Sequence, residues 1–469
     1  MQSSKLYIYG LGGKFIPQAV YMLTNIVLAR LLAPSDFGAI GVLAVFFMIA
    51  ETMMDAGLGG SLIYKKNVTK IDCSTVFVFN LVVSHAMYFA LFMTSGYIED
   101  YFSIENLSTI ARIVGLVFVI NSWGLVVSTM ITKNLQFKEL MELSIISGVI
   151  ASVVSIMCAI CGLGVYALVA YQLVLALSRV VGLYVIYPMR LSFSFSYKSF
   201  KELAPFGIYT TIILIIDNIY ENLLTVLFGK YLNVREAGYI SQSKRIEESA
   251  SKTLMSTINN VAFPYLSSVK EKVAFLKESS SLYKSICLML FPLLTLVSVY
   301  SEEIITILLG GEWVKAGKYL SFLIYAGLFM VMESLYRNFI KSLGEVRELM
   351  IYTIYKRLIG FVLVFAALTV SVNWVLYAYV ISSAIAFFLN LYLFCKLMEE
   401  KILSQFFRSV SYIIPCLLYL LSVIFISSIT DNKMYSILYT VLFITMYYLI
   451  ILPKMYKMSV VNYVKRLIK

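Results

Sequence analysis

A run of charged side chains lies between Ala237 and Pro264, where the flanking sequence is uniformly apolar. Five charged residues fall within about two and a half helical turns: Lys244, Arg245, Glu247, Glu248 and Lys252. One charge at the centre of a transmembrane helix costs roughly 2.5–3.5 kcal/mol for insertion, so a helix that carries five cannot face lipid. We expect these side chains to bind water or the polar groups of a substrate inside a helix bundle.

The spacing of the polar residues supports this interpretation. They recur about every three or four positions and therefore share one helix face, which comprises Ser241, Lys244, Arg245, Glu248, Lys252, Ser256 and Asn259. The alternative is a helix on the membrane surface, stabilised by pairs such as Lys244 with Glu248. The alternation of charge between the loops, described below, favours a helix that crosses.

Further ionisable residues occur inside apolar segments, where such residues are functional candidates by default. Glu51 and Asp55, Asp217 and Glu221, and Glu333 and Arg337 are each four positions apart and so share a helix face. The candidate substrate-binding residues are Arg30, Arg179, Lys230, Lys244, Arg245, Glu248, Lys252 and Arg337, and the candidate ion-coupling residues are Asp55, Asp217, Glu221 and Glu333. The alternative is that these charges only pair with one another. Cations and carboxylates within the segments balance, so the sequence alone does not show a cationic cavity.

The composition indicates an integral membrane protein with an all-α fold. Hydrophobic residues make up 60% of the chain, charged residues 14%, and the mean hydropathy is +0.86. The net charge of +12 comes from basic residues dispersed among short loops, which indicates topology signals and no nucleic-acid partner. Cys158 and Cys161 lack a second pair of metal ligands nearby, so we expect no metal site and no cofactor.

About fourteen transmembrane helices are predicted. They cover residues 11–31, 37–60, 73–95, 108–130, 141–161, 164–187, 203–229, 238–266, 284–301, 317–340, 353–372, 374–395, 411–429 and 434–452. Basic residues concentrate in alternate loops, and the segment with Lys356 and Arg357 is counted among the inside ones. The loop around Asp100 is acidic and the loop around Lys198 is basic, so both termini are predicted to be cytoplasmic.

The chain repeats itself at an offset of 200 residues. The segment from Leu31 to Gly41 matches the one from Tyr231 to Ser241, with Gly38 opposite Gly238. Both lie at the outer turn between the first two helices of a six-helix block, which predicts two lobes in parallel orientation. The lobes cover residues 1–200 and 201–400, residues 401–469 add two helices and a basic tail, and cargo would bind in a groove between the lobes.

The segments LARLLAPSDFGAIG, DAGLGGSLI, VAFPYLSSVKE, LLGGEWVKAGKYLSFL and KSLGEVREL resemble the polysaccharide transporter family of Wzx-type flippases. The resemblance is particularly to the branch of colanic and teichuronic acid exporters, within the multidrug, oligosaccharidyl-lipid and polysaccharide exporter superfamily. The resemblance covers roughly residues 1–400. It implies a multi-pass protein of the bacterial cytoplasmic (inner) membrane that flips undecaprenyl-pyrophosphate-linked oligosaccharides by alternating access, for O-antigen, capsule or exopolysaccharide synthesis.

The resemblance also implies roles for individual residues and partners. Basic cavity residues of the family bind the pyrophosphate, a role carried over to Arg30, Lys230, Lys244, Arg245 and Lys252. Acidic residues would contact sugars or a coupling ion, H⁺ or Na⁺. Expected partners are the lipid-linked oligosaccharide, membrane lipid, and the polysaccharide polymerase and chain-length regulator of the same pathway.

Two other classes of function stay open. A cation-coupled multidrug exporter related to the multidrug and toxic compound extrusion group would share the two lobes, although it normally has twelve helices. A membrane-embedded polymerase or ligase would need a larger outer loop and an acid–base set, and His85 is the sole histidine. We expect no catalytic residue. The segment from Gly10 to Lys14 departs from a phosphate-binding loop at two positions, which argues against ATP-driven transport.

Overall fold

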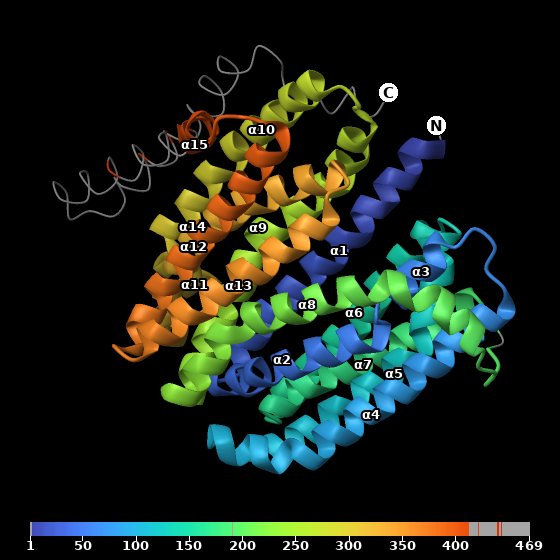
Figure 1. The fold of residues 1–469 in the computed structure, drawn as a ribbon. Coiled ribbons are helices and arrows are strands. Elements are labelled where there is room, and N and C mark those ends of the chain that lie inside the picture. The colour runs from blue at the N-terminus through green and yellow to red at the C-terminus, as the bar shows by residue number, and fades with distance from the viewer. Residues whose placement is uncertain (1, 190, 412–420, 422–438, 440–441, 443–469) are drawn as a thin grey trace. The chain divides into compact units, whose positions relative to one another are not determined.

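A computed structural model describes residues 2–189 and 191–411, with residues 421, 439 and 442. The described chain is almost entirely helical and contains no strand, which confirms the all-α prediction (Figure 1). Its helices are α1 (Gln2–Leu31), α2 (Pro34–Asp55), α3 (Leu58–Tyr64), α4 (Lys70–Phe102), α5 (Leu107–Lys133), α6 (Phe137–Ile160), α7 (Val165–Ile186), α8 (Tyr197–Tyr231), α9 (Val234–Ser268), α10 (Lys272–Val299), α11 (Ser301–Leu309), the 3₁₀ turn η1 (Gly311–Trp313), α12 (Val314–Ser342), α13 (Val346–Leu368), α14 (Val372–Met398) and α15 (Ile402–Ser411). The predicted helices at 411–429 and 434–452 lie outside the described residues, apart from a few positions.

Within the described residues, nine helical segments are long and apolar enough to span a bilayer, as expected for a multi-pass membrane protein. The charged helix α9 is not among them, because its polar residues lower its hydropathy. It has 35 residues and is therefore about 52 Å long, which exceeds the roughly 30 Å of a hydrocarbon core. Its crossing of the membrane stays a prediction.

The span predicted over 37–60 matches a candidate membrane span at Pro34–Ile63, but the span is not one unbroken helix. The chain forms two helices there, α2 and α3, interrupted by left-handed backbone at Ala56 (φ 42°) and Gly57 (φ 68°). A left-handed residue ends a helix because its amide no longer points along the helix axis, and hydropathy does not register this change of dihedral angle. The break places Asp55 at the last position of α2.

The described chain forms two compact units. The first comprises Met1–Gln242 and Thr306–Val314, and the second Ser243–Ile305 and Lys315–Lys469. In the first unit α4 packs on α5, α5 and α6 pack on α7, α1 packs on α6 and α2 packs on α8, as the blue-to-green helices of Figure 1 show. The lobes predicted from the sequence repeat, residues 1–200 and 201–400, stay a prediction.

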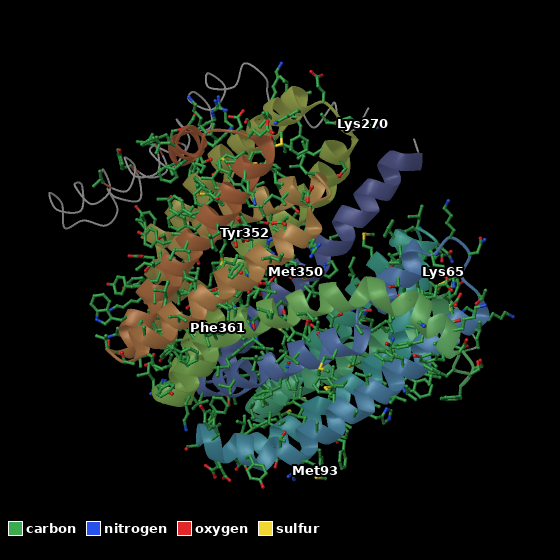
Figure 2. The ribbon with its side chains drawn as sticks, in the orientation of Figure 1. Lys65, Met93, Lys270, Met350, Tyr352 and Phe361 are labelled. Carbon is green, nitrogen blue, oxygen red and sulfur yellow. The ribbon has the colours of Figure 1, made fainter. Side chains whose placement is uncertain are left out.

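In the second unit α13 packs on α14, and α14 on α15. The rings of Tyr352 and Tyr392 stack with centroids 6.3 Å apart, which joins α13 to α14, and Figure 2 labels Tyr352 on α13. At one end of this unit Lys272 Nζ lies 2.7 Å from Glu399 Oε2, and this hydrogen bond holds the pKa of Glu399 below its usual value. The contact ties the start of α10 to the end of α14.

The two repeats meet at Gly38 on α2 and Gly238 on α9, both in the first unit. A Cβ atom on Gly38 would lie 1.8 Å from the carbonyl oxygen of Val234, and one on Gly238 would lie 1.9 Å from that of Pro34. Gly38 and Gly238 are 200 positions apart, and so are Pro34 and Val234, so the two contacts are equivalent. The first turns of α2 and α9 therefore pack backbone against backbone about a local twofold relation. The sequence repeat predicted the equivalence of the two glycines but not their contact.

Candidate functional site

The charged face of α9 begins at Lys244, directly after Ser243, where the second unit begins. Lys244 Nζ lies 3.7 Å from Glu248 Oε1, and the two side chains are 12% and 30% exposed. Arg245 is also partly buried. Lys244, Arg245 and Glu248 thus share a partly accessible face, as predicted from their spacing. The side chain of Lys252 lies outside the described residues.

Glu247 points to a different side of α9 and is only 4% exposed. Its carboxylate accepts a hydrogen bond from Ser251 Oγ at 2.6 Å. A Cβ atom on Gly327 would lie 2.6 Å from Glu247 Oε1. The lack of a side chain at this position of α12 therefore leaves room for the Glu247 carboxylate. Glu247 therefore packs between helices and is not a member of the accessible face.

A second charged cluster lies where α12, α13 and α14 meet, centred on the carboxylate of Glu333. Its Oε1 accepts hydrogen bonds from Lys356 Nζ at 2.5 Å and from Asn390 Nδ2 at 2.8 Å. Arg337 Nη2 donates to Oε1 at 2.9 Å and to Oε2 at 2.8 Å. Glu333 is 5% exposed, and the predicted pairing with Arg337 is present. This saturation with N–H donors favours a pairing role for Glu333 over the role of an ion-coupling carboxylate.

The interpretation of Lys356 and Arg357 as cytoplasmic topology signals is wrong. Both lie within α13 and are buried, with 2% and 8% exposure. The predicted helix began at residue 353 and placed both cations in its first turn, where they counted as signals at a membrane face, whereas α13 begins at Val346 and carries both cations further along the helix. With them included, the described cations well inside α9, α12 and α13 outnumber the carboxylates there.

In the first unit Asp55 lies at the break between α2 and α3. Its Oδ1 accepts a hydrogen bond from the backbone N–H of Gly59 at 3.1 Å. A Cβ atom on Gly59 would lie 2.7 Å from this oxygen and 3.2 Å from Thr129 Oγ1, so a larger residue would displace the carboxylate. A helix interrupted within a membrane span is the kind of place where transporters bind ions, which keeps Asp55 as a candidate.

The other candidates of the first unit lie on α2, α7 and α8. Glu51 and Arg179 interact electrostatically across α2 and α7, and both are exposed. Asp217 on α8 is buried and Glu221 is half-buried. Next to Asp217, Asn218 Nδ2 donates to Thr52 Oγ1 at 2.8 Å, which fixes α8 against α2. The structure thus brings Glu51 and Arg179 within electrostatic range of each other, a proximity that the sequence did not predict.

Arg30 and Lys230, the equivalent cations of the two outer turns, both bind backbone. Arg30 Nε donates to the carbonyl of Leu308 at 2.9 Å, and its Nη2 donates to that of Ile307. Lys230 Nζ donates to the backbone carbonyl of Tyr101 and lies 4.1 Å from the centroid of the Tyr101 ring. These contacts give both residues a structural role at the outer turns, and their role toward substrate stays a prediction.

Trp313 fixes the segment Thr306–Val314 to the first unit. Its Nε1 donates to the carbonyl of Ala29 at 2.8 Å, and its ring contacts those of Phe37 and Tyr239 with centroids 5.3 and 5.9 Å apart. The side chain is 1% exposed. The segment LLGGEW, which resembles a family motif, therefore holds Thr306–Val314 against the first unit near the Gly38–Gly238 contact.

The sequence matches a known family over most of its length. Residues 27–318 match the family model described as polysaccharide biosynthesis protein. The chain belongs to this family. It is similar to the teichuronic acid biosynthesis protein TuaB of Bacillus subtilis, with 24% identity over 77% of this chain and 76% of the relative. It is also similar to the lipopolysaccharide biosynthesis protein WzxC of Escherichia coli, with 25% identity over 64% of this chain and 62% of the relative.

Solved structures of membrane transporters have a fold similar to that of this chain. The inward closed conformation of the lipid II flippase MurJ superposes with a TM-score of 0.76 at 12% identity, covering 94% of this chain and 98% of MurJ. An inward-facing multidrug resistance MATE transporter superposes with a TM-score of 0.63 at 15% identity, covering 83% of this chain and 98% of the transporter. At these identities the likeness shows the fold of a membrane transporter. Among the described residues no group of three or more His, Cys, Asp or Glu residues is placed to hold a metal ion.

Proposed function

We propose that the protein is a flippase that moves undecaprenyl-pyrophosphate-linked oligosaccharides across the bacterial cytoplasmic (inner) membrane for surface polysaccharide synthesis. The observation that carries this proposal is the positively charged interior of the second unit in a member of a polysaccharide biosynthesis family. Well inside α9, α12 and α13, five described cations accompany three carboxylates: Lys244, Arg245, Arg337, Lys356 and Arg357 with Glu247, Glu248 and Glu333.

The chemistry of such a cargo fits these residues. Its polyprenyl tail is apolar and can stay in lipid, while its pyrophosphate and sugars must pass a region of low dielectric. Arginine binds phosphate oxygens through paired N–H groups, and lysine supplies a point charge. Arg245 and Lys244 can therefore replace the hydrogen bonds that the pyrophosphate loses when it leaves water. Carboxylates such as Glu248 can accept hydrogen bonds from sugar hydroxyls. The charged face of α9 therefore suits both parts of the polar head.

Transport by alternating access requires a source of energy, and coupling to H⁺ or Na⁺ is the mechanism we propose. Asp55 is the best-placed candidate because it lies at a helix break, where its carboxylate accepts a hydrogen bond from the backbone N–H of Gly59. Asp217 and Glu221 on α8 are the further candidates, whereas Glu333 is already bound by two cations. We expect no catalytic chemistry, and we propose the polymerase and chain-length regulator of the pathway as protein partners.

A multidrug exporter is the second candidate, favoured by the superposition on a MATE transporter and by the carboxylate at the helix break. Deleting the gene separates the two. For a flippase we expect loss of a surface polysaccharide and accumulation of its lipid-linked repeat unit inside the cell. Unchanged polysaccharide together with increased sensitivity to cationic drugs would favour the exporter.

The proposed orientation, with both termini cytoplasmic, predicts the labelling of single cysteines. In a variant without native cysteines, Asp100→Cys is expected to react with a membrane-impermeant maleimide in intact cells. Lys198→Cys is expected to react only after the cells are opened, because basic loops stay on the cytoplasmic side. Asp100 and Lys198 are both exposed, so burial will not mask either site. Labelling of Lys198→Cys in intact cells would reverse the proposed topology.

A further inference from the structure

Helix α15 follows α14 after a left-handed residue at Glu399 (φ 53°) and ends at Ser411. The sequence analysis placed no helix here, because the predicted spans end at residue 395 and resume at 411. We propose that α15 is a helix of the membrane interface that binds an anionic phospholipid of the cytoplasmic leaflet. The lipid chains cover its apolar face, and the headgroup lies beside Arg408. This inference goes beyond the proposed transport, because the lipid is not the cargo, and it takes only the choice of leaflet from the proposed orientation.

The side chains of α15 divide into a buried polar side and an exposed apolar side. Gln405 and Ser409, about one turn apart, are 5% and 1% exposed and face the second unit. Leu403 and Phe407, also about one turn apart, are 68% and 62% exposed. A helix with this division presents apolar surface to its surroundings and polar groups to the protein. It is typical of an amphipathic helix that lies in the plane of a membrane interface.

The apolar face of α15 continues the outward-facing surface of α14. The ring of Phe406 stacks on that of Phe388 with centroids 4.9 Å apart, and its centroid lies 5.7 Å from that of Phe407. Phe388 is 43% exposed and belongs to a helix that is long and apolar enough to span a bilayer. The exposed rings therefore form one apolar surface from α14 to α15. Because lipid chains cover the exposed apolar surface of a span, the same chains can cover α15.

The contacts of α15 place it at the depth of the membrane interface. Helix α12 has 29 residues and is therefore about 43 Å long, close to the thickness of a bilayer with its headgroups. Tyr336 Oη and Ser409 Oγ share a hydrogen bond of 2.7 Å, and Tyr336 lies about 9 Å before the end of α12. Interfacial helices bury their apolar face about 5–10 Å into the boundary between headgroups and acyl chains. In Figure 1 α15 is seen almost along its axis and α12 from the side, so α15 does not run parallel to the span.

The charges around α15 favour an anionic lipid. The residues from 396 to 411 contain three exposed cations, Lys396, Lys401 and Arg408, and two carboxylates, of which Glu399 is already bound by Lys272. None of the three cations forms an ion pair within the described part of the chain. Anionic lipids of the cytoplasmic leaflet attract lysine and arginine close to the membrane surface. Charge complementarity therefore selects an anionic headgroup over a zwitterionic one.

A small pocket beside Arg408 refines the chemical class of the headgroup. It lies where α10, α12, α14 and α15 meet, and its lining includes Ser280, Tyr336, Gln405 and the exposed Arg408. The side-chain amide of Gln405 is buried, and it forms no hydrogen bond with the residues that the structure describes. A buried amide is costly unless a partner reaches it, so the pocket suits a ligand with hydroxyl groups. A guanidinium next to it suits a phosphodiester, and phosphatidylglycerol combines the two.

Thermal unfolding of the purified full-length protein in mild detergent tests the headgroup. Dioleoylphosphatidylglycerol is compared with the same amount of dioleoylphosphatidylcholine and with sodium phosphate at equal ionic strength. We expect phosphatidylglycerol to raise the Tm by about 3 °C over phosphatidylcholine. Sodium phosphate should give no such rise, because it lacks the acyl chains. An equal effect of the two lipids, or an equal rise with sodium phosphate, would overturn the lipid site.

Variants of α15 locate the effect within the protein. Lys401→Gln/Arg408→Gln should reduce the rise given by phosphatidylglycerol at least about twofold. Lys198→Gln is the matched control, because it removes an exposed cation from the first unit at the same predicted membrane face. Gln405→Leu should abolish the preference for phosphatidylglycerol over phosphatidic acid, which has the phosphate without the glycerol hydroxyls. Since each rise is measured within one variant, a lower starting Tm does not affect the comparison. An undiminished rise in Lys401→Gln/Arg408→Gln would contradict a site at α15.

Fluorescence quenching in liposomes tests the apolar face. In a variant without native cysteines, Leu403→Cys and Ser404→Cys are labelled with a nitrobenzoxadiazole dye. Both positions are exposed and adjacent, but only Leu403 belongs to the apolar face. We expect lipids with a nitroxide on the acyl chain to quench the dye at position 403 at least about twofold more than at 404, and iodide to show the reverse. Equal quenching would overturn the proposal. So would protection of position 403 from both quenchers, which would mean that the C-terminal segment or a second copy of the chain covers it.

Failure of this inference can be told apart from failure of the proposed function. If deleting the gene abolishes polysaccharide export but both lipids raise the Tm equally, the flippase stands and the lipid site is wrong. If the rise with phosphatidylglycerol depends on Lys401 and Arg408 while deletion leaves export unchanged, the lipid site stands and the flippase proposal is wrong.

Discussion

Replacing Gly38 by alanine is expected to reduce polysaccharide export roughly a hundredfold. The new Cβ atom would lie 1.8 Å from the carbonyl oxygen of Val234, a backbone atom that no rotamer change can move. Overpacking of this kind costs typically about 1–3 kcal/mol, and about 3 kcal/mol corresponds to a hundredfold fall in the packed population. Because the contact is reciprocal, Gly238→Ala should have the same effect through the carbonyl of Pro34.

Gly96→Ala on α4 is the matched control, because a Cβ atom there would have no neighbour within 4 Å. This variant should export normally. Export is measured as surface polysaccharide per amount of protein in the membrane, so that loss of transport is separated from loss of protein. The Tm of the purified variants reports the packing itself and should fall for Gly38→Ala and Gly238→Ala. Normal export and an unchanged Tm in Gly38→Ala would show that the outer turns do not depend on this contact.

Neutralising both Lys244 and Arg245 is expected to abolish export while the protein still inserts. A charge-assisted hydrogen bond contributes about 1.5–3 kcal/mol, so losing two contacts to the pyrophosphate should lower export by at least about a hundredfold. Arginine and lysine should not be interchangeable here, because guanidinium binds phosphate through two parallel N–H groups. Arg245→Lys should therefore lower export more than Lys244→Arg.

The contact between Lys244 and Glu248 defines the structural alternative to this second prediction. If Lys244 serves only to neutralise Glu248, 3.7 Å away, then Lys244→Gln/Arg245→Gln leaves a partly buried carboxylate without its cation and lowers the amount of protein. Adding Glu248→Gln should then restore both protein and export. Recovery of export in this triple variant would count against substrate binding by α9, whereas normal protein levels without export would support it.

The repeat and the charged doublets could be predicted from the sequence because their signals are local. A charge that stands out in an apolar segment, a four-residue spacing and a glycine at equivalent positions are read directly from the chain. Glu333 and Arg337 are one helical turn apart, so their pairing followed from spacing alone. The pairing of Lys244 with Glu248 followed in the same way.

Other features of the candidate site were missed because they depend on helix boundaries and backbone dihedral angles. Because the predicted helix lacked the first two turns of α13, Lys356 and Arg357 fell in its first turn and counted as topology signals, whereas in the structure they are buried. Left-handed backbone at Ala56 and Gly57 divided the second predicted helix and placed Asp55 at its break. Hydropathy averages over many residues, so it registers neither the exact start of a helix nor a change of dihedral angle at two positions.

The sequence by itself determined that this protein is an all-α membrane protein with an internal repeat and a polar helix, since composition and periodicity follow from the order of residues. Only the tertiary structure decided which polar groups meet: Glu333 with Lys356, 23 positions away, and with Asn390, 57 positions away. It also decided that Trp313 binds Ala29, 284 positions away, and that Gly38 touches the turn of Gly238. Contacts between residues so distant in sequence depend on how the helices pack, and helix packing depends on the shapes of whole helix surfaces, which no single segment of the sequence contains.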